Sequence, residues 1–285
     1  MLITEFHKLY AKKGLTSEIN NSFQKIIYSY FKQNRRDFPF RKDITPYKVL
    51  ISEIMLQQTQ TGRVSEKFLK FIGQFPDFQT LSKAPLQKVL KAWQGLGYNR
   101  RAKALKEIAE KIIDEYSGKL PKSVQILKTF PQIGHNTASS ISTFAFNKPN
   151  IFIETNIRRV FIYFFFPTKT RVKDSEILPI IERTIDKNNP REWYYALMDY
   201  GFMLSKKHPE LNKKSAHYRK QSPFKGSKRE IRGLILKLLI ENRALAKSEI
   251  IKILDYPTER IQEVISQLKK EGFIRHRNNL LTIAK

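Results

Sequence analysis

The chain contains no cysteine, which excludes disulfide bonds, thiol catalysis and any metal or iron–sulfur site that needs thiolate ligands. Its five histidines are scattered and none forms an i, i+4 pair, so we expect no histidine metal site. No apolar run reaches the roughly 18 residues that a membrane helix requires, and the first residues lack the apolar region of a signal peptide. These absences predict a soluble, cytoplasmic protein that needs no cofactor and contacts no membrane.

Acidic residues are also scarce. The 285 residues include 26 Asp and Glu against 53 Lys and Arg, which gives a formal net charge of +27. Such an imbalance indicates a polyanionic partner, either nucleic acid or an acidic membrane surface. A ribosome-associated or merely lysine-rich protein is the alternative. Because the hydrophobic content of 41% is that of a globular protein with aromatic side chains and helices, we favour nucleic acid.

Helical periodicity runs along almost the whole chain, and its breaks divide it into two predicted domains. Residues 205–227 are basic with few apolar side chains, and we interpret them as an irregular segment and linker. Beyond it the sequence predicts three helices followed by a β-hairpin that turns at Asn278 and Asn279, the order of a winged helix–turn–helix module. We therefore expect one domain over residues 1–226 and a second over residues 227–285.

The stretch LISEIMLQQTQ, residues 50–60, places an acid within an apolar stripe. As part of a helix predicted over residues 46–58, it carries Glu53 beside Leu50 and Ile54, with Gln57 and Gln60 on the same side. A charged carboxylate is disfavoured among apolar side chains. We therefore expect Glu53 to have a raised pKa and a chemical role.

Three further motifs suit nucleic-acid chemistry when they are taken together. In GLGYNRRAKAL, residues 95–105, two glycines present Tyr98 for insertion into a base stack, while Arg100, Arg101 and other cations hold phosphates. In FPQIGHNTA, residues 130–138, a glycine turn before a helix directs backbone N–H groups at a phosphate. In IFIETNIRRVF, residues 151–161, Glu154 precedes a helix. The alternatives are a solvated surface, an ordinary turn and a carboxylate that only stabilises a helix N-terminus.

The order and spacing of these four motifs closely resemble the helix-hairpin-helix (HhH-GPD) DNA glycosylase superfamily, over about residues 36–225. The resemblance is closest to the MutY-type adenine DNA glycosylases. It implies an all-α, two-lobed fold and a partner of double-stranded DNA that contains a mismatched or damaged base. It also implies that Glu53 is the buried catalytic acid, that Glu154 is the carboxylate that stabilises or captures the sugar cation, and that Gln57 and Gln58 probe the DNA stack.

Departures from the family pattern refine these expectations. The second carboxylate is usually aspartate, and Gln132 replaces the first glycine of the hairpin. Asn136 stands where bifunctional relatives carry a lysine, so we expect a monofunctional enzyme with little or no strand cleavage. The cysteines that hold an iron–sulfur cluster in many relatives are absent after Tyr195–Gly201, and a basic loop replaces them. We interpret that loop as a clusterless DNA contact, the alternative being a solvated loop.

The C-terminal module has no resemblance to the domain with which MutY-type enzymes inspect the opposite base. Its presumed recognition helix starts with the acids Glu259 and Glu263, so the wing offers better DNA contacts, although binding to another protein is an equal alternative. The predicted DNA-binding residues are Gln57, Gln58, Tyr98, Asn99, Arg100, Gln132, Gly134, His135, Asn136, Thr137, Arg158, Lys206, Lys207, Arg275 and Arg277.

Together these features predict a monomeric base excision repair enzyme of the nucleoid that removes adenine opposite guanine or 8-oxoguanine by hydrolysis. Removal of thymine or uracil opposite guanine is the first alternative. A non-catalytic DNA-binding regulator built on a glycosylase scaffold is the second. For either glycosylase activity the target base must leave the duplex to reach the protein's acids.

Overall fold

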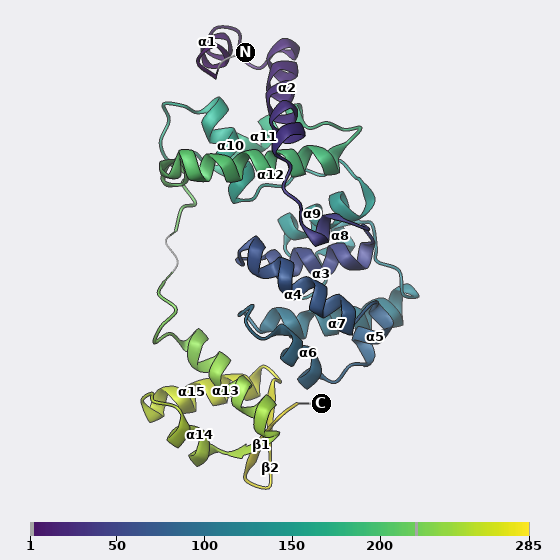
Figure 1. Ribbon diagram of the computed structural model, residues 1–285, viewed down its shortest axis with the longest axis vertical. Coiled ribbons are helices and arrows are strands. Elements are labelled where there is room, and N and C mark those ends of the chain that lie inside the picture. The colour runs from purple at the N-terminus through teal and green to yellow at the C-terminus, as the bar shows by residue number, and fades with distance from the viewer. Residues whose placement is uncertain (1–2, 220–221, 285) are drawn as a thin grey trace. The chain divides into compact units, whose positions relative to one another are not determined.

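The computed structural model of the protein describes residues 3–219 and 222–284, and it is almost entirely helical (Figure 1). The chain divides into two compact units. The first unit comprises residues 1–41, 122–128 and 133–220, and the second comprises residues 42–121, 129–132 and 221–285. Within the described ranges, no helix combines the length and the apolar character needed to span a membrane. The predicted division at residues 226 and 227 stays a prediction.

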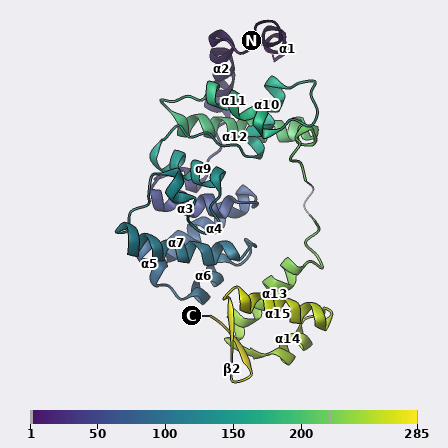
Figure 2. The same ribbon diagram turned by 180° about the vertical axis from the view of Figure 1, so that it is seen from behind.

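The first unit is a helical assembly around an aromatic core. Its helices are α1 (Ile3–Lys13), α2 (Ser17–Asn34), α8 (Val124–Leu127), α9 (His135–Phe146), α10 (Thr155–Phe165), α11 (Asp174–Thr184) and α12 (Pro190–Lys207), with 3-10 turns at Pro39–Arg41 and Pro209–Lys214. The α10 helix packs on α12 (Figure 2). Phe23 lies at the centre, because its ring contacts Phe161, Phe164 and Trp193 edge-on at 5.0–5.5 Å.

A buried ion-pair cluster ties α12 to the segment that follows α2. Asp199 is 1% exposed, and it accepts hydrogen bonds from Arg36 at 2.7 Å and from Arg41 at 2.9 Å. The Arg41 guanidinium also lies over the ring of Tyr195, 4.4 Å from its centroid. Removing one partner of such a group leaves a buried charge unpaired, which typically costs about 3–5 kcal/mol. Residues 36–41 are thereby held against α12 within the first unit.

The second unit begins with five helices, α3 (Pro46–Leu56), α4 (Thr61–Gln74), α5 (Phe78–Lys83), α6 (Leu86–Trp93) and α7 (Arg100–Tyr116). The predicted start of α3 is confirmed, because Thr45 Oγ1 accepts a hydrogen bond from the backbone N–H of Lys48 and Pro46 occupies the first turn. The buried Trp93 indole donates a hydrogen bond to the carbonyl of Gly97 at 3.0 Å. This bond supports the loop between α6 and α7.

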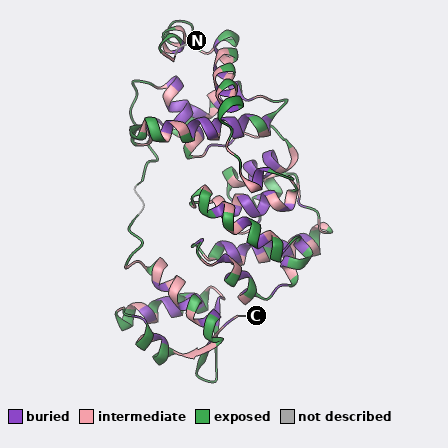
Figure 3. Cartoon of the chain, viewed as in Figure 1, coloured by how far each residue is buried: buried purple, intermediate pink, exposed green. Residues whose placement is uncertain are grey.

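The second unit ends with α13 (Lys228–Asn242), β1 (Ala244–Ala246), α14 (Lys247–Ile253), α15 (Thr258–Lys270), β2 (Ile274–Arg277) and β3 (Leu280–Ile283). The strands form one antiparallel sheet in the order β1-β3-β2, with Ile274 opposite Ile283. Both residues of the predicted turn, Asn278 and Asn279, have the positive φ that a tight hairpin requires. Figure 3 shows buried residues on the inner faces of these helices. The element order is that of a winged helix.

Several elements differ from the expectations drawn from the sequence. Neither α1 nor β1 was predicted. The segment expected to be irregular from residue 205 begins instead with the last turn of α12, which continues to Lys207, and with a 3-10 turn at Pro209–Lys214. The helix predicted over residues 46–58 ends two residues earlier, at Leu56. Its early end has a specific cause in the packing of Arg101.

Candidate functional site

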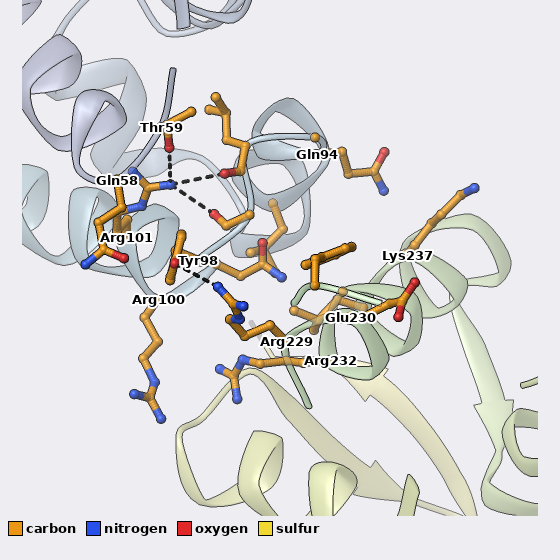
Figure 4. A pocket seen from close by; sticks show the side chains of 18 of the residues that line it. Gln58, Thr59, Gln94, Tyr98, Arg100, Arg101, Arg229, Glu230, Arg232 and Lys237 are labelled. Carbon is orange, nitrogen blue, oxygen red and sulfur yellow. Dashed lines mark hydrogen bonds between the residues drawn. The ribbon is translucent and has the colours of Figure 1, made fainter. Parts of the chain in front are cut away.

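Arg101 organises the loops that follow α3 and α6 in the second unit. Its side chain was expected to contact phosphates, but this expectation is wrong, because the residue is only 3% exposed. The guanidinium donates hydrogen bonds to six acceptors, namely Thr59 Oγ1 and the carbonyls of Ile54, Met55, Gln57, Leu96 and Gly97. Figure 4 shows the bond to Thr59 among them. Burial lowers the pKa of Arg101 to about 10, against the opposing effect of Tyr98.

This arrangement ends α3 and places the two glutamines. Carbonyls at a helix C-terminus have no partner within the helix, and a cation there is favourable. Because Arg101 takes these carbonyls, the chain leaves the helix after Leu56. Gln57 and Gln60 therefore do not continue the helical face that carries Glu53, contrary to the expectation from their spacing. Glu53 itself is half-buried on α3, between the buried residues Ser52 and Ile54.

Three loop residues of the second unit adopt a left-handed backbone that is uncommon for side-chain-bearing residues. Gln58 has φ 53°, Tyr98 has φ 48° and Gln132 has φ 61°. Gln57 Nε2 also donates a hydrogen bond to the carbonyl of Gln132 at 3.1 Å, which links two of these loops. The conformation of Gln132 accounts for the glycine that the family pattern has there, since glycine adopts positive φ without strain. Strained backbone of this kind is frequent at functional sites.

Glu154 forms the N-cap of α10 in the first unit. Its Oε1 accepts hydrogen bonds from the backbone N–H groups of Asn156 at 2.8 Å and Ile157 at 2.9 Å. Its Oε2 accepts a third from the Asn156 side-chain amide at 3.2 Å. The carboxylate is half-buried and held in one orientation. Glu154 itself, and not the following Thr155 or Asn156, takes the N-cap position.

Arg159 fixes this cap from one turn further along α10. It is 5% exposed, and it donates to Asn156 Oδ1 at 2.8 Å and to the carbonyl of Gly201 at 2.6 Å. Its other nitrogens bind Asn212 Oδ1 at 3.0 and 3.2 Å. Burial lowers the pKa of Arg159, and the charge of Glu154 opposes this shift. The arginine thus connects the Glu154 turn to α12 and to the turn beyond it.

Gly201 allows α10 and α12 to approach at this point. A Cβ atom at Gly201 would lie 2.3 Å from the carbonyl oxygen of Asn156 and 2.7 Å from its carbonyl carbon, so no larger residue is accommodated without movement of the backbone. This glycine has helical φ, so its role is close packing rather than an unusual conformation. Sequence reasoning noted the Tyr195–Gly201 segment but missed the role of its glycine. The signal was a glycine inside an otherwise unbroken helical pattern.

Asn136 contributes to the position of Glu154 from α9. Its Oδ1 accepts a hydrogen bond from the backbone N–H of Ile153 at 3.4 Å. Tyr194 donates to the carbonyl of Asn150 at 2.9 Å, and its ring stacks on Phe152 at 4.0 Å. The strand-like segment that leads into Glu154 is therefore held on both sides, by α9 and by α12.

Several predicted DNA contacts are engaged within the protein. Arg100 binds Glu271 through two nitrogens, and Arg158 binds Asp174 at 2.6 and 2.7 Å. The side-chain hydrogen bond from Arg100 lowers the pKa of Glu271 to about 2, with a further contribution from Arg232. The remaining predicted contacts are half-exposed or exposed: Gln57, Gln58, Tyr98, Asn99, Gln132, Gly134, His135, Asn136, Thr137, Lys206, Lys207, Arg275 and Arg277. Their contact with DNA stays a prediction.

The segment after α12 does not fit an iron–sulfur cluster, because the chain has no cysteine to ligate iron. No group of three histidine, aspartate or glutamate residues that could hold a metal ion occurs in the described part of the chain. Protein contacts hold this segment. Leu211 is buried, Asn212 binds Arg159, and Val172 exchanges backbone hydrogen bonds with Lys214 and Ala216.

Comparison with known proteins shows which families and proteins this chain resembles. Residues 51–183 match the profile of the HhH-GPD superfamily base excision DNA repair proteins. The chain is 34% identical over 195 residues to the adenine DNA glycosylase of Buchnera aphidicola subsp. Baizongia pistaciae (strain Bp), covering 67% of this chain and 55% of that protein. It is 30% identical over 193 residues to the adenine DNA glycosylase of Rattus norvegicus, covering 63% and 37%. The chain therefore spans about half, or less, of the length of these relatives.

Three other comparisons extend the match. The chain is 27% identical over 192 residues to the thymine/uracil-DNA glycosylase of Methanothermobacter thermautotrophicus, covering 66% of this chain and 87% of that protein. A thermostable thymine-DNA glycosylase structure matches with a TM-score of 0.58 at 25% identity, covering 70% of this chain and 96% of that one. A trapped endonuclease III–DNA covalent intermediate matches with a TM-score of 0.53 at 19% identity, covering 74% and 91%.

The fold is that of a helix-hairpin-helix DNA glycosylase, as predicted. The chain contains a domain of the HhH-GPD superfamily of base excision DNA repair proteins, and adenine DNA glycosylases of the MutY type are among its homologues. The resemblance inferred from the four motifs is thereby confirmed.

Proposed function

We propose that this protein is a monofunctional DNA glycosylase that hydrolyses the N-glycosidic bond of adenine mispaired with guanine or 8-oxoguanine. The observation that carries the proposal is that residues 51–183, the range that matches the base excision repair superfamily, contain both Glu53 and Glu154. Relatives named adenine DNA glycosylases match 67% and 63% of the chain at 30% identity or more. The strongly basic composition agrees with a DNA substrate.

Glu53 is proposed as the general acid. Departure of a purine from deoxyribose leaves developing positive charge on the sugar, and protonation of the base makes it a better leaving group. A half-buried carboxyl group with the apolar neighbours Ile54 and Met55 suits this role, since burial disfavours the charged form of an acid. Proton donation then breaks the bond between the base and C1′.

Glu154 is proposed as the second carboxylate, which stabilises or captures the sugar cation before water completes the hydrolysis. Its three hydrogen bonds fix the carboxylate, and a helix N-terminus stabilises negative charge. Two of these bonds come from backbone N–H groups of α10, so they depend on the helix rather than on mobile side chains. We propose that a carboxylate fixed in this way can take the role of the usual aspartate, although glutamate is longer by one methylene group.

The extrusion of the base is assigned to the loops that Arg101 organises. Tyr98 and Gln58 are held in left-handed conformations at the ends of two loops, and they are proposed to fill the DNA stack when the adenine leaves it. The backbone of residues 132–137 and two cations in the last turn of α12, Lys206 and Lys207, are proposed to bind phosphates of the DNA backbone. The DNA-bound state of a structural neighbour, endonuclease III, agrees with a duplex substrate.

The first test uses the full chain with four duplexes, which contain A·G, A·8-oxoG, T·G and U·G pairs. Abasic product is detected by strand cleavage with alkali after single-turnover incubation. We expect product from the adenine-containing duplexes. Borohydride should trap no covalent complex, because Asn136 offers no amine for a Schiff base. A trapped adduct would contradict the monofunctional assignment.

A thymine or uracil glycosylase is the second candidate, and one observation favours it. The match to the thymine/uracil-DNA glycosylase covers 87% of that protein, against 55% of the first adenine-specific relative. Product from only the T·G or U·G duplex would establish this alternative. A protein that binds duplex DNA in a salt-sensitive way but releases no base from any duplex would instead be a regulator on a glycosylase scaffold.

A further inference from the structure

A large groove in the second unit joins the base-probing loops to the C-terminal module. Its volume is about 1470 Å³, and it is lined by Gln57, Gln58 and Tyr98 on one side and by residues of α13 on the other (Figure 4). The proposed base-probing residues and a helix more than a hundred residues away in the sequence therefore share one surface. Neither the family resemblance nor the sequence motifs assign a function to α13.

The α13 wall of the groove is basic. Lys228, Arg229, Arg232 and Lys237 line it, and Glu230 is the single acid among the residues that line the groove. That acid is engaged, since it accepts hydrogen bonds from the Gly226 backbone and from the hydroxyl of Tyr256. Lys228, Arg232 and Lys237 pair with Glu263, Glu271 and Glu241, none of which lines the groove. Cations therefore outnumber acids on the groove wall itself, which favours an anionic ligand.

Arg229 makes direct contact with Tyr98, which is proposed to fill the DNA stack. Its Nη1 donates to the hydroxyl of Tyr98 at 3.0 Å, and its guanidinium lies 5.8 Å from the centroid of that ring. Its Nη2 donates to the carbonyl of Ser222 at 2.8 Å. The C-terminal module thus reaches the side chain that is proposed to enter the DNA stack, and a strand passing Tyr98 would meet Arg229.

Arg232 supplies an independent indication that the groove takes an anion. Its side chain is 12% exposed and pairs with Glu271 through Nη2. Among the residues that the structure describes, its Nη1 is a buried nitrogen without a hydrogen-bond partner. An unsatisfied buried donor is unfavourable, and an acceptor oxygen in the groove would supply its missing hydrogen bond. A phosphate oxygen provides both the acceptor and the negative charge.

Other surfaces of the module are less suited to DNA. The exposed side of α15, the presumed recognition helix, carries Glu259 and Glu263. Arg275 and Arg277 on β2 are exposed, but they are not among the residues that line the groove. Of α13, α15 and β2, α13 is the element that carries groove-lining cations and also contacts Tyr98.

We propose that the groove-lining face of α13, through Lys228, Arg229, Arg232 and Lys237, binds the phosphate backbone of the DNA strand that passes Tyr98. The inference deepens the proposed function and rests on it for the identity of the ligand. The winged-helix module then extends the DNA-binding surface of the glycosylase domain through its first helix, and not through its recognition helix or wing.

The test measures affinity for an undamaged 20-base-pair duplex as a function of salt, using the full chain. Arg229→Ala and Lys237→Ala each remove one cation from the groove wall. We expect each variant to bind at least about threefold more weakly and to lower the slope of log K against log salt by about 0.9, the value for one phosphate contact. Lys252→Ala is the matched control, because Lys252 is exposed on α14 and does not line the groove.

Two results would overturn the inference. One is wild-type affinity and salt dependence in both groove variants. The other is an equal loss in Lys252→Ala, which would indicate a general effect of charge. Because the chain has no cysteine, Lys237→Cys can also carry a single photo-crosslinker, with Lys252→Cys as control. We expect a crosslink to DNA from position 237 alone, and its absence there would contradict the assignment.

The outcome is independent of catalysis. If the wild-type protein releases no base but the groove variants lose affinity, the proposed glycosylase activity fails and the α13 contact stands. If the wild-type protein releases adenine but the groove variants bind as tightly as it does, the α13 contact fails alone.

Discussion

The two units each contain a buried arginine that shapes a functional region, and the two arginines do so in different ways. Arg101 is 3% exposed and binds only neutral oxygens, five of which are backbone carbonyls. Arg159 is 5% exposed and binds the side chains of Asn156 and Asn212 and one carbonyl, while it also interacts electrostatically with Glu154. The first arginine fixes loop shape, and the second fixes a carboxylate.

Arg101 therefore organises the backbone of loops, whereas Arg159 sets the electrostatic environment of Glu154, the proposed second carboxylate. Loss of the guanidinium would leave five carbonyls without a donor, which is strongly unfavourable. The two loops, Gln57–Thr59 and Leu96–Tyr98, therefore both depend on Arg101. Around Arg159, amide side chains can rotate toward water when the arginine is lost. We therefore expect the fold to depend more on Arg101, and Glu154 to depend more on Arg159.

Replacement of Arg101 should give the largest loss of stability. Arg101→Met keeps the apolar volume but leaves the carbonyls of the α3 terminus buried without donors, and we expect a loss of about 3–5 kcal/mol in the free energy of unfolding. Arg101→Lys should recover only part of it, because an ammonium group cannot reach six acceptors. Urea denaturation measures both. A loss below about 1 kcal/mol in Arg101→Met would refute the organising role.

Gly201→Ala should give the next largest effect, through the contact that positions Asn156. The added Cβ would lie 2.3 Å from a backbone oxygen, so α10 and α12 must separate, at about 2–4 kcal/mol. Gly73→Ala is the control, because Gly73 lies in α4 with no atom within 4 Å of the added Cβ, and there alanine should gain up to about 1 kcal/mol. Equal thermal stability of the two variants would contradict the close-packing argument.

Arg159→Met should cost less stability than Arg101→Met, about 1–3 kcal/mol, but it should impair base release more strongly than its effect on folding explains. It removes the positive charge near Glu154 and the support of Asn156 together. Asn212→Ala is the matched variant, because it removes one acceptor of Arg159 and keeps the charge. Single-turnover rates on folded protein compare the two. Equal rates would show that the charge of Arg159 has no influence on Glu154.

The smallest effect is expected at Gln132. Its φ of 61° strains a side-chain-bearing residue, and Gln132→Gly removes the strain while it adds freedom to the unfolded chain. The two effects largely cancel, with a net gain of about 0.5 kcal/mol. The accepted hydrogen bond from Gln57 uses the backbone carbonyl and is retained. A clear destabilisation, measured by thermal unfolding, would mean that the Gln132 side chain has contacts of greater value.

Sequence patterns predicted the parts of this molecule that depend on local signals. Thr45-Pro46 specified the start of α3, the asparagine pair specified the final hairpin, and the four motifs specified the family. They failed where a distant residue decides the outcome. The end of α3 depends on Arg101, which lies 45 residues beyond Leu56 and reads locally as one more surface cation. The importance of Gly201 likewise depends on the approach of α10.

The central claim is that Glu53 donates the proton to the base and that the carboxylate of Glu154 stabilises or captures the sugar cation. It is tested most directly by single-turnover release of adenine from an A·8-oxoG duplex with Glu53→Gln and Glu154→Gln, alongside DNA affinity. Gln at position 154 retains an oxygen that can cap α10, so the helix should persist while the charge is lost. We predict that each variant loses at least about 100-fold in rate and binds DNA as tightly as the wild type. Wild-type rates of release in either variant would contradict the account.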